Sequence, residues 1–214
     1  TALIATDGFR DVIEIADEGR YDQYDIFIDK PRQLVPRQLR FTVPERIDVM
    51  GKVWVDLDEA AVRKVAKALK AEKVEAVAVA FIHSYANGAH EQRVRDILAR
   101  EAPGIAVTLS SEVCPEMREY ERTSTAVANA YVQPLMAGYL GRLKARFAAE
   151  GYGKPIHLMT SGGSLATLET AARFPIRLVE SGPAGGAILA AYIAAERGED
   201  KVLSFDMGGT TAKI

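Results

Sequence analysis

The sequence is poor in the features that mark several classes of protein. Among its 214 residues there is one cysteine, Cys114, so no disulfide can form within the chain, which suits a reducing compartment. The formal net charge is −2, too close to neutral for the basic field that attracts nucleic acids or anionic membranes. No apolar run is long enough to cross a bilayer. We therefore expect a cytoplasmic protein with no nucleic-acid and no membrane partner.

The composition that remains is that of a globular protein, with 48% hydrophobic and 26% charged residues. An almost uninterrupted apolar run at 74–82 predicts a strand that is covered on both faces in a parallel sheet. Helices are predicted at about 57–71, behind an Asp56 cap, and after an Asn87 cap, and a second strand at 105–109. This alternation of helix and strand predicts an α/β fold.

The flanking segments carry weaker patterns. Extended residues between 25 and 55 predict an antiparallel hairpin, and a long helix is expected from Glu119, kinked or restarted at Pro134. A short strand is predicted at 176–179. The charges of 118–122 favour a surface ion-pair cluster over a group that orients substrate or an interdomain contact. His83 and His90 lack a third ligand at an established spacing, so a structural role is favoured over a metal site.

The most informative segment is 201–214, which reads KVLSFDMGGTTAKI. Apolar residues lead into Asp206 and a glycine pair, Gly208 and Gly209, which have no Cβ and let backbone amides approach phosphate oxygens. Thr210 and Thr211 add hydroxyl donors, and Asp206 is a candidate ligand for Mg²⁺. A phosphate grip and an ordinary glycine hairpin at a strand end both fit this pattern.

Two other glycine-rich segments precede it. Ser181 and Gly182 open SGPAGG, with Ser181 as the predicted N-cap of a small-residue helix at 187–195. Ser161 and Gly162 follow a predicted strand at 156–159, where backbone amides can bind an anion or simply form a turn. The order near the end of the sequence is therefore helix, short turn, strand and glycine loop.

This order resembles the ATPases of the actin, sugar kinase and heat-shock chaperone superfamily, and within it the ATP-dependent hydantoinase and oxoprolinase family. Six ordered blocks carry the resemblance: TDGFRDVIEI (6–15), HSYANGAHE (83–91), EYERTSTAVANAYVQP (119–134), SGGS (161–164), SGPAGG (181–186) and FDMGGTT (205–211).

The resemblance implies partial ribonuclease H-like lobes with a mixed sheet and flanking helices, divided into residues 1–117 and 118–214. It implies ATP and Mg²⁺ as cofactors, Asp206 as metal ligand, and Asp206 and Glu180 as catalytic residues. The residues expected to bind the cofactor are Ser161, Gly162, Ser181, Gly182, Gly208, Gly209, Thr210 and Thr211. The chain is expected to be a fragment that lacks the first-lobe phosphate loop and binds ATP weakly by itself.

The implied activity is ATP-driven opening of a cyclic amide such as a hydantoin, oxoproline or another lactam, with a hydantoinase B-type second subunit or domain as partner. An acetone or acetophenone carboxylase subunit and a non-catalytic ATP-responsive module are the alternatives. The chain departs from the family pattern at three positions: Gly88 replaces a proline, Gly162 replaces an asparagine, and Lys213 replaces an acidic residue.

Overall fold

The computed structural model describes residues 1–17, 22, 24–29, 31–209 and 211–214, which form two compact units, Thr1–Pro134 and Leu135–Ile214. Among these described residues, no helix has the length and apolar character needed to span a membrane. The units divide inside a long helix, whereas the sequence-based boundary between residues 117 and 118 stays a prediction.

The first unit is built around a parallel sheet of four strands in the order β2-β1-β5-β6. Its elements are β1 (Ala2–Thr6), α1 (Val12–Ile15), a 3-10 helix (Arg37–Leu39), β2 (Arg40–Val43), β3 (Arg46–Ile47), β4 (Val53–Val55), α2 (Glu59–Ala71), β5 (Ala76–Ala80), α3 (Ala89–Glu101), β6 (Ala106–Leu109), α4 (Ser110–Val113) and the first half of α5 (Glu119–Ala149).

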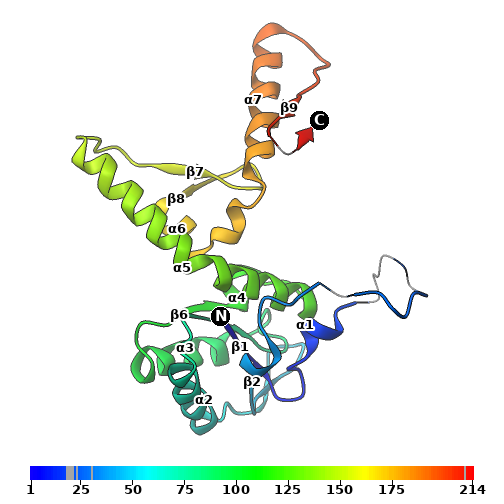
Figure 1. The fold of residues 1–214 in the computed structure, drawn as a ribbon, viewed down its shortest axis with the longest axis vertical. Coiled ribbons are helices and arrows are strands. Elements are labelled where there is room, and N and C mark those ends of the chain that lie inside the picture. The colour runs from blue at the N-terminus through cyan, green and yellow to red at the C-terminus, as the bar shows by residue number, and fades with distance from the viewer. Residues whose placement is uncertain (18–21, 23, 30, 210) are drawn as a thin grey trace. The chain divides into compact units, whose positions relative to one another are not determined.

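The core of this unit lies between the sheet and the helices α2 and α3, which pack against each other (Figure 1). Val62 of α2 and Leu98 of α3 pack with Ile4 and Val79, and all four side chains are almost fully buried. β1 and β5 are the two central strands and are buried along their whole length. The apolar run at 74–82 therefore predicted its strand correctly, because a central parallel strand is covered on both faces.

Several local predictions need correction. The helix expected at about 57–71 is α2, but Asp58 rather than Asp56 caps it, accepting the N–H of Ala61 at 2.9 Å. The side chain of Asn87 accepts the N–H of Ala89, whereas Gly88 occupies the N-cap position of α3. Only β3 and β4 form the antiparallel hairpin expected between residues 25 and 55, because β2 pairs with β1 in parallel. Part of that span, residue 30, lies outside the described residues.

The second unit is a smaller arrangement of hairpins and helices around α5. Leu140 of α5 packs against Leu168 and Ala171. Its elements are β7 (His157–Met159), β8 (Leu165–Thr167), α6 (Leu168–Arg173), a 3-10 helix (Pro175–Leu178), α7 (Ser181–Arg197), β9 (Asp206–Met207) and β10 (Ala212–Lys213). β7 with β8 and β10 with β9 form two antiparallel pairs.

Three predictions for the second half of the chain are wrong or incomplete. The segment 176–179 is helical rather than a strand, because Pro175 fixes a helical φ at the start of the turn and Arg177 donates its N–H to the carbonyl of Phe174. α5 passes through Pro134 as one assigned helix and does not restart there. Only Asp206 and Met207 of the predicted terminal strand are paired.

Candidate functional site

The predicted phosphate loop is the turn of the β9-β10 hairpin, here called the glycine turn (Met207–Ala212). Met207 pairs with Ala212 and Asp206 with Lys213, and the N–H of Gly208 donates to the carbonyl of Thr211 at 2.9 Å. Thr210 lies outside the described residues. The carboxylate of Asp206 belongs to an exposed residue at the base of this turn.

The glycines of the two predicted phosphate-binding segments leave their backbone accessible. A Cβ placed on Gly209 or Gly182 would meet no atom within 4 Å, and on Gly208 the nearest atom is the Thr211 carbonyl oxygen at 3.9 Å. Packing within the described chain therefore does not require glycine at these positions. Open space over the backbone is what the close approach of a phosphate oxygen needs, so these residues fit the predicted role.

Lys213 is a neighbour of both residues predicted to act in catalysis, of Glu180 through its side chain and of Asp206 through strand pairing. Glu180 immediately precedes α7 in a left-handed conformation, with φ of 61°, and its Oε2 accepts from the ammonium of Lys213 at 2.5 Å. Across the β9-β10 ladder, Lys213 is the partner of Asp206. The residue that departs from the family pattern thus places a cation beside Glu180, on the strand opposite Asp206. Ser181 and Gly182 form the first turn of α7, and Glu180, not Ser181, occupies the N-cap position.

The Ser161 turn follows β7 and is closed by its own contacts. The N–H and hydroxyl of Ser161 both donate to the carbonyl of Arg177, at 2.8 and 3.1 Å. Gly163 has a φ of +79°, and a Cβ there would lie 2.9 Å from Cδ1 of Ile188, so α7 packs directly against this turn. Ser161, Gly162 and the side chain of Arg177 also line a cavity of about 390 Å³. The donors of Ser161 are thus already used within the unit.

At the carboxyl edge of the parallel sheet in the first unit lies a buried polar network that the sequence did not reveal. The hydroxyl of Thr6 donates to one oxygen of Glu45 and accepts the N–H of Ile82 at 3.0 Å. The other oxygen of Glu45 lies 2.8 Å from Nδ1 of His90. This network gives His90 a structural role, and the described part of the chain contains no group of three metal-ligating side chains.

Glu91, the neighbour of His90, is fully buried and joins three segments. One of its oxygens accepts from the N–H of Phe81 at 2.9 Å and from the hydroxyl of Ser110 at 2.6 Å, and the other accepts the N–H of Ser111 at 2.8 Å. Burial raises the pKa of the Glu91 carboxyl, against the opposing effect of these donors. The carboxylate therefore ties the first turn of α3 to the ends of β5 and β6.

The charged run 118–122 is not wholly a surface cluster, because Arg122 is buried. Its side chain is almost fully buried and donates to the carbonyls of Glu116, Met117 and Phe81 at 2.6 to 3.1 Å. Among the described residues of this run, only Arg118 and Glu121 form an ion pair with each other at the surface. Arg122 thus anchors the start of α5 to the end of β5.

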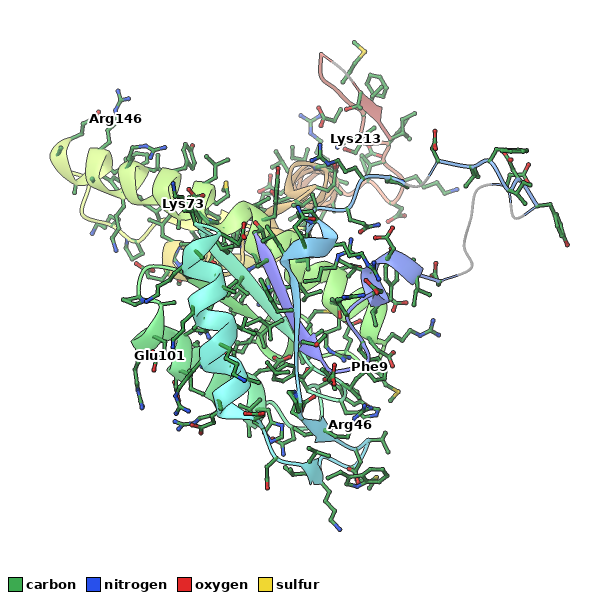
Figure 2. The ribbon with its side chains drawn as sticks, turned by 60° about the horizontal axis from the view of Figure 1, so that its bottom comes forward. Phe9, Arg46, Lys73, Glu101, Arg146 and Lys213 are labelled. Atoms are coloured by element: carbon green, nitrogen blue, oxygen red, sulfur yellow. The ribbon has the colours of Figure 1, made fainter. Side chains whose placement is uncertain are left out.

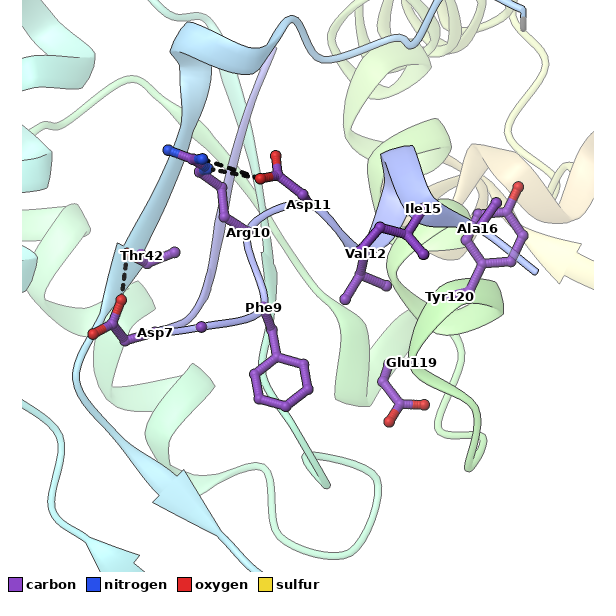
Figure 3. A pocket seen from close by; sticks show the side chains of 11 residues that line it. Asp7, Phe9, Arg10, Asp11, Val12, Ile15, Ala16, Thr42, Glu119 and Tyr120 are labelled. Atoms are coloured by element: carbon purple, nitrogen blue, oxygen red, sulfur yellow. Dashed lines mark hydrogen bonds and ion pairs between the residues drawn. The ribbon is translucent and has the colours of Figure 1, made fainter. Parts of the chain in front are cut away.

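A cavity of about 640 Å³ opens beside the TDGFRD segment of the first unit (Figure 3). Asp11 accepts from Arg37, Arg10 and Arg40, and the hydrogen bonds from Arg37 and Arg10 hold the pKa of its carboxyl well below its usual range. The cavity is lined by Asp7, Gly8, Phe9, Arg10, Asp11, Val12, Ile15, Ala16, Thr42, Glu119 and Tyr120.

Solved structures share this fold. The nucleotide-free structure of acetone carboxylase matches with a TM-score of 0.84 and 29% identity, and the structure of the ATP-dependent caprolactamase of Pseudomonas jessenii matches with a TM-score of 0.84 and 35% identity. Each match covers 99% of this chain and 31% of the other. The chain therefore has the α/β architecture of the actin-like ATPases, as the sequence predicted.

Two family models match consecutive parts of the chain, the hydantoinase/oxoprolinase N-terminal region at residues 1–102 and hydantoinase/oxoprolinase at residues 122–214. The chain belongs to the hydantoinase/oxoprolinase family. An uncharacterised protein of Methanocaldococcus jannaschii is 42% identical over 212 residues, and the caprolactamase subunit alpha of Pseudomonas jessenii is 36% identical over 214. Both alignments cover 99% of this chain, which spans only 31% of either relative.

Proposed function

We propose that this chain forms the nucleotide-binding part of an ATP-dependent hydrolase of cyclic amides. The observation that carries the proposal is the glycine turn: accessible glycine backbone and a hydroxyl stand beside an exposed carboxylate, Asp206. A relative across nearly the whole chain is a caprolactamase subunit, which acts on a cyclic amide. The fold and the family also favour ATP as the nucleotide.

The chemistry required is activation of an unreactive carbonyl. An amide is stabilised by resonance, and transfer of the phosphoryl group of ATP to its oxygen releases ADP and makes the carbonyl carbon electrophilic. Water adds to that carbon, and the ring C–N bond then breaks with transfer of a proton to the nitrogen. The resulting acyl phosphate is hydrolysed by a second water to the carboxylate and phosphate. The protein contributes positioning and charge stabilisation to such a transfer. Backbone N–H groups of Gly209 and Gly182 and the hydroxyl of Thr211 would hold phosphate oxygens, and Glu180 would orient the attacking water.

Asp206 is the residue proposed to hold Mg²⁺, since hard oxygen ligands suit this ion. When bound there, Mg²⁺ supplies positive charge that offsets the charge of the phosphates during transfer. Lys213, opposite Asp206 in the hairpin, adds a second positive charge in the same region. The family's usual acidic residue at this position would instead add negative charge, so the lysine lowers the number of carboxylates available to a metal.

A partner subunit is part of the proposal. The 36% identical relative is named as the alpha subunit of its enzyme, and this chain covers 31% of it. We therefore expect the complete polypeptide that contains these residues to act with a second subunit or domain, of the hydantoinase B type.

The test is ATP hydrolysis by the complete polypeptide with its partner, in the presence of ε-caprolactam, hydantoin or 5-oxoproline. We expect one of these lactams to stimulate phosphate release and to be opened in equal amount. Asp206→Asn should lower kcat by about a hundredfold or more, as loss of a charge-stabilising group does. The control is Asp200→Asn, which removes an exposed carboxylate six residues before Asp206 and should leave kcat unchanged.

A second candidate function follows from the acetone carboxylase structure, which matches with the same TM-score as caprolactamase. In that case acetone or acetophenone with bicarbonate stimulates ATP hydrolysis and lactams do not. ATP hydrolysis that responds to a polypeptide and to none of these small molecules would instead support the non-catalytic module.

A further inference from the structure

Resting on the proposed function, we propose that the cavity beside residues 6–11 binds the cyclic amide itself. Phe9, Val12 and Ile15 form an apolar wall, and the carboxylates of Asp7 and Glu119 lie on opposite sides of Phe9 (Figure 3). We assign one of these two carboxylates as the acceptor of the single amide N–H. The cavity volume, about 640 Å³, falls in the range of small-molecule sites.

The charges around the cavity separate into two groups. Asp11 is neutralised by arginines, with Arg10 using both Nε and Nη2 to bind it, at 3.3 and 3.0 Å. Asp7 instead accepts from a neutral group, the hydroxyl of Thr42, at 3.1 Å. Neither Asp7 nor Glu119 forms an ion pair with any residue in the described ranges. These two carboxylates therefore retain strong acceptor capacity at the cavity.

A lactam presents the complementary surface. Its N–H is a donor that a carboxylate accepts in a charge-assisted hydrogen bond, and its methylene groups gain free energy by leaving water. The apolar wall is exposed enough to be covered, since the Ile15 side chain is 71% accessible. The Arg46 guanidinium lies over the Phe9 ring, 4.9 Å from its centroid, and helps to hold the ring in place (Figure 2).

The acceptor is also fixed before any ligand arrives. The N–H of Asp7 donates to the carbonyl of Val43 at 3.0 Å, and the preceding residue, Thr6, is held by Glu45 and by the N–H of Ile82. Glu119 begins α5, which Arg122 anchors to the carbonyl of Phe81. A preorganised acceptor loses little conformational entropy on binding, so the N–H contact should contribute measurably to affinity.

The experiment is a direct titration of the 214-residue chain with ε-caprolactam, followed by NMR. N-methylcaprolactam is the matched ligand, because it keeps the ring and the carbonyl but has no N–H. We expect ε-caprolactam to bind with perturbation of signals from the cavity residues, and N-methylcaprolactam to bind about tenfold more weakly, the effect of losing one hydrogen bond to a charged group.

Variants assign the acceptor. Asp7→Asn and Glu119→Gln replace a carboxylate oxygen by an amide donor without a change of size, and the double variant should raise the Kd for ε-caprolactam by about tenfold or more. Glu72→Gln removes an exposed carboxylate at the end of α2 and serves as the control, with an unchanged Kd. Thermal unfolding of each variant confirms that the unit is folded.

The cavity assignment is overturned if ε-caprolactam perturbs no cavity residue, or if the double variant and N-methylcaprolactam bind as well as the controls. Its failure is distinct from failure of the proposed function. If lactams stimulate ATP hydrolysis by the complete polypeptide while the double variant leaves their KM unchanged, the function stands and the cavity does not. If no lactam stimulates ATP hydrolysis, the function fails whatever the titration shows.

Discussion

Replacing Glu91 tests whether the buried network at the sheet edge stabilises the first unit. Glu91→Ala removes the acceptor for two backbone N–H groups, the buried N–H of Phe81 and the partly buried N–H of Ser111. The hydroxyl of Ser110 can turn to Ser84, 3.0 Å away. A buried unpaired donor costs about 1–3 kcal/mol and a partly buried one costs less, so we expect a loss of about 3 kcal/mol in the free energy of unfolding. Such a loss is a large part of the stability of a typical domain.

Glu91→Gln separates the hydrogen bonds from the charge. The amide oxygen can still accept from Phe81 and Ser110, whereas the amide nitrogen faces the N–H of Ser111, so the expected loss is about 2 kcal/mol near pH 5. Burial raises the pKa of Glu91, so the folded state holds its proton more tightly than the unfolded state does. This contribution is fully present below the unfolded pKa, about 4.3, and is lost as the pH rises through the folded pKa. The stability difference between wild type and Glu91→Gln should therefore shrink as the pH rises from 4 towards neutrality.

The assay is urea unfolding followed by circular dichroism and by the fluorescence of Trp54, the single tryptophan, which lies in the first unit. Glu72→Gln is the control, since an exposed charge of this kind changes stability by less than about 0.5 kcal/mol. Equal losses in Glu91→Ala and Glu72→Gln would refute the reasoning. A stability difference between wild type and Glu91→Gln that grows with pH would contradict the sign of the pKa shift.

Three further predictions concern other parts of the chain. Arg122→Lys should cost about 2–3 kcal/mol in urea unfolding, because one ammonium cannot reach all three carbonyls that the guanidinium contacts; an unchanged midpoint would argue against this anchor. Gly163→Ala should lower the thermal stability of the second unit by about 1–2 kcal/mol, since its φ is +79° and the new Cβ would meet Ile188; a neutral result in calorimetry would contradict this packing. Lys213→Ala should change stability by less than about 1 kcal/mol, because its ion pair with Glu180 is exposed, and a larger loss in the same calorimetric scan would mean that the pair is structural.

Much of the first unit could be predicted from the periodicity of its apolar residues. The strands that were missed or misassigned depend on partners that are distant in sequence. The stripes that form α2 and the apolar run of β5 are local patterns, so they identified these elements directly. β1 was missed because it is only a five-residue strand at the start of the sequence, without a preceding element to define it. β2 was taken for half of a hairpin because alternation in sequence does not say which strand is the neighbour, and here that neighbour is β1.

The glycine turn was predictable because its residues are adjacent in sequence, whereas its electrostatic surroundings were not. Lys213 was noticed as a departure from the family pattern, but its contact with Glu180 spans 33 residues and depends on where α7 begins. The strand expected before the turn is mostly unpaired, and Leu203 and Phe205 are exposed. Hydrophobic alternation predicts a strand only when a partner strand and a core are available to it.

The buried polar groups of the first unit are best understood together with the cavity beside them. Polar groups cost free energy in an interior unless every donor and acceptor is paired, so such groups are retained where geometry matters as well as stability. Here Thr6 is hydrogen-bonded to Glu45, which also contacts His90, and this set fixes the end of β1 immediately before Asp7. Apolar side chains in place of these polar ones could fill the same volume. They would not accept the N–H of Ile82, and so they would not fix the position of the chain where it leaves the sheet. We therefore expect substitutions at His90 to weaken ligand binding at Asp7, although His90 does not line the cavity. The effect should be proportional to the disturbance of the Thr6 turn.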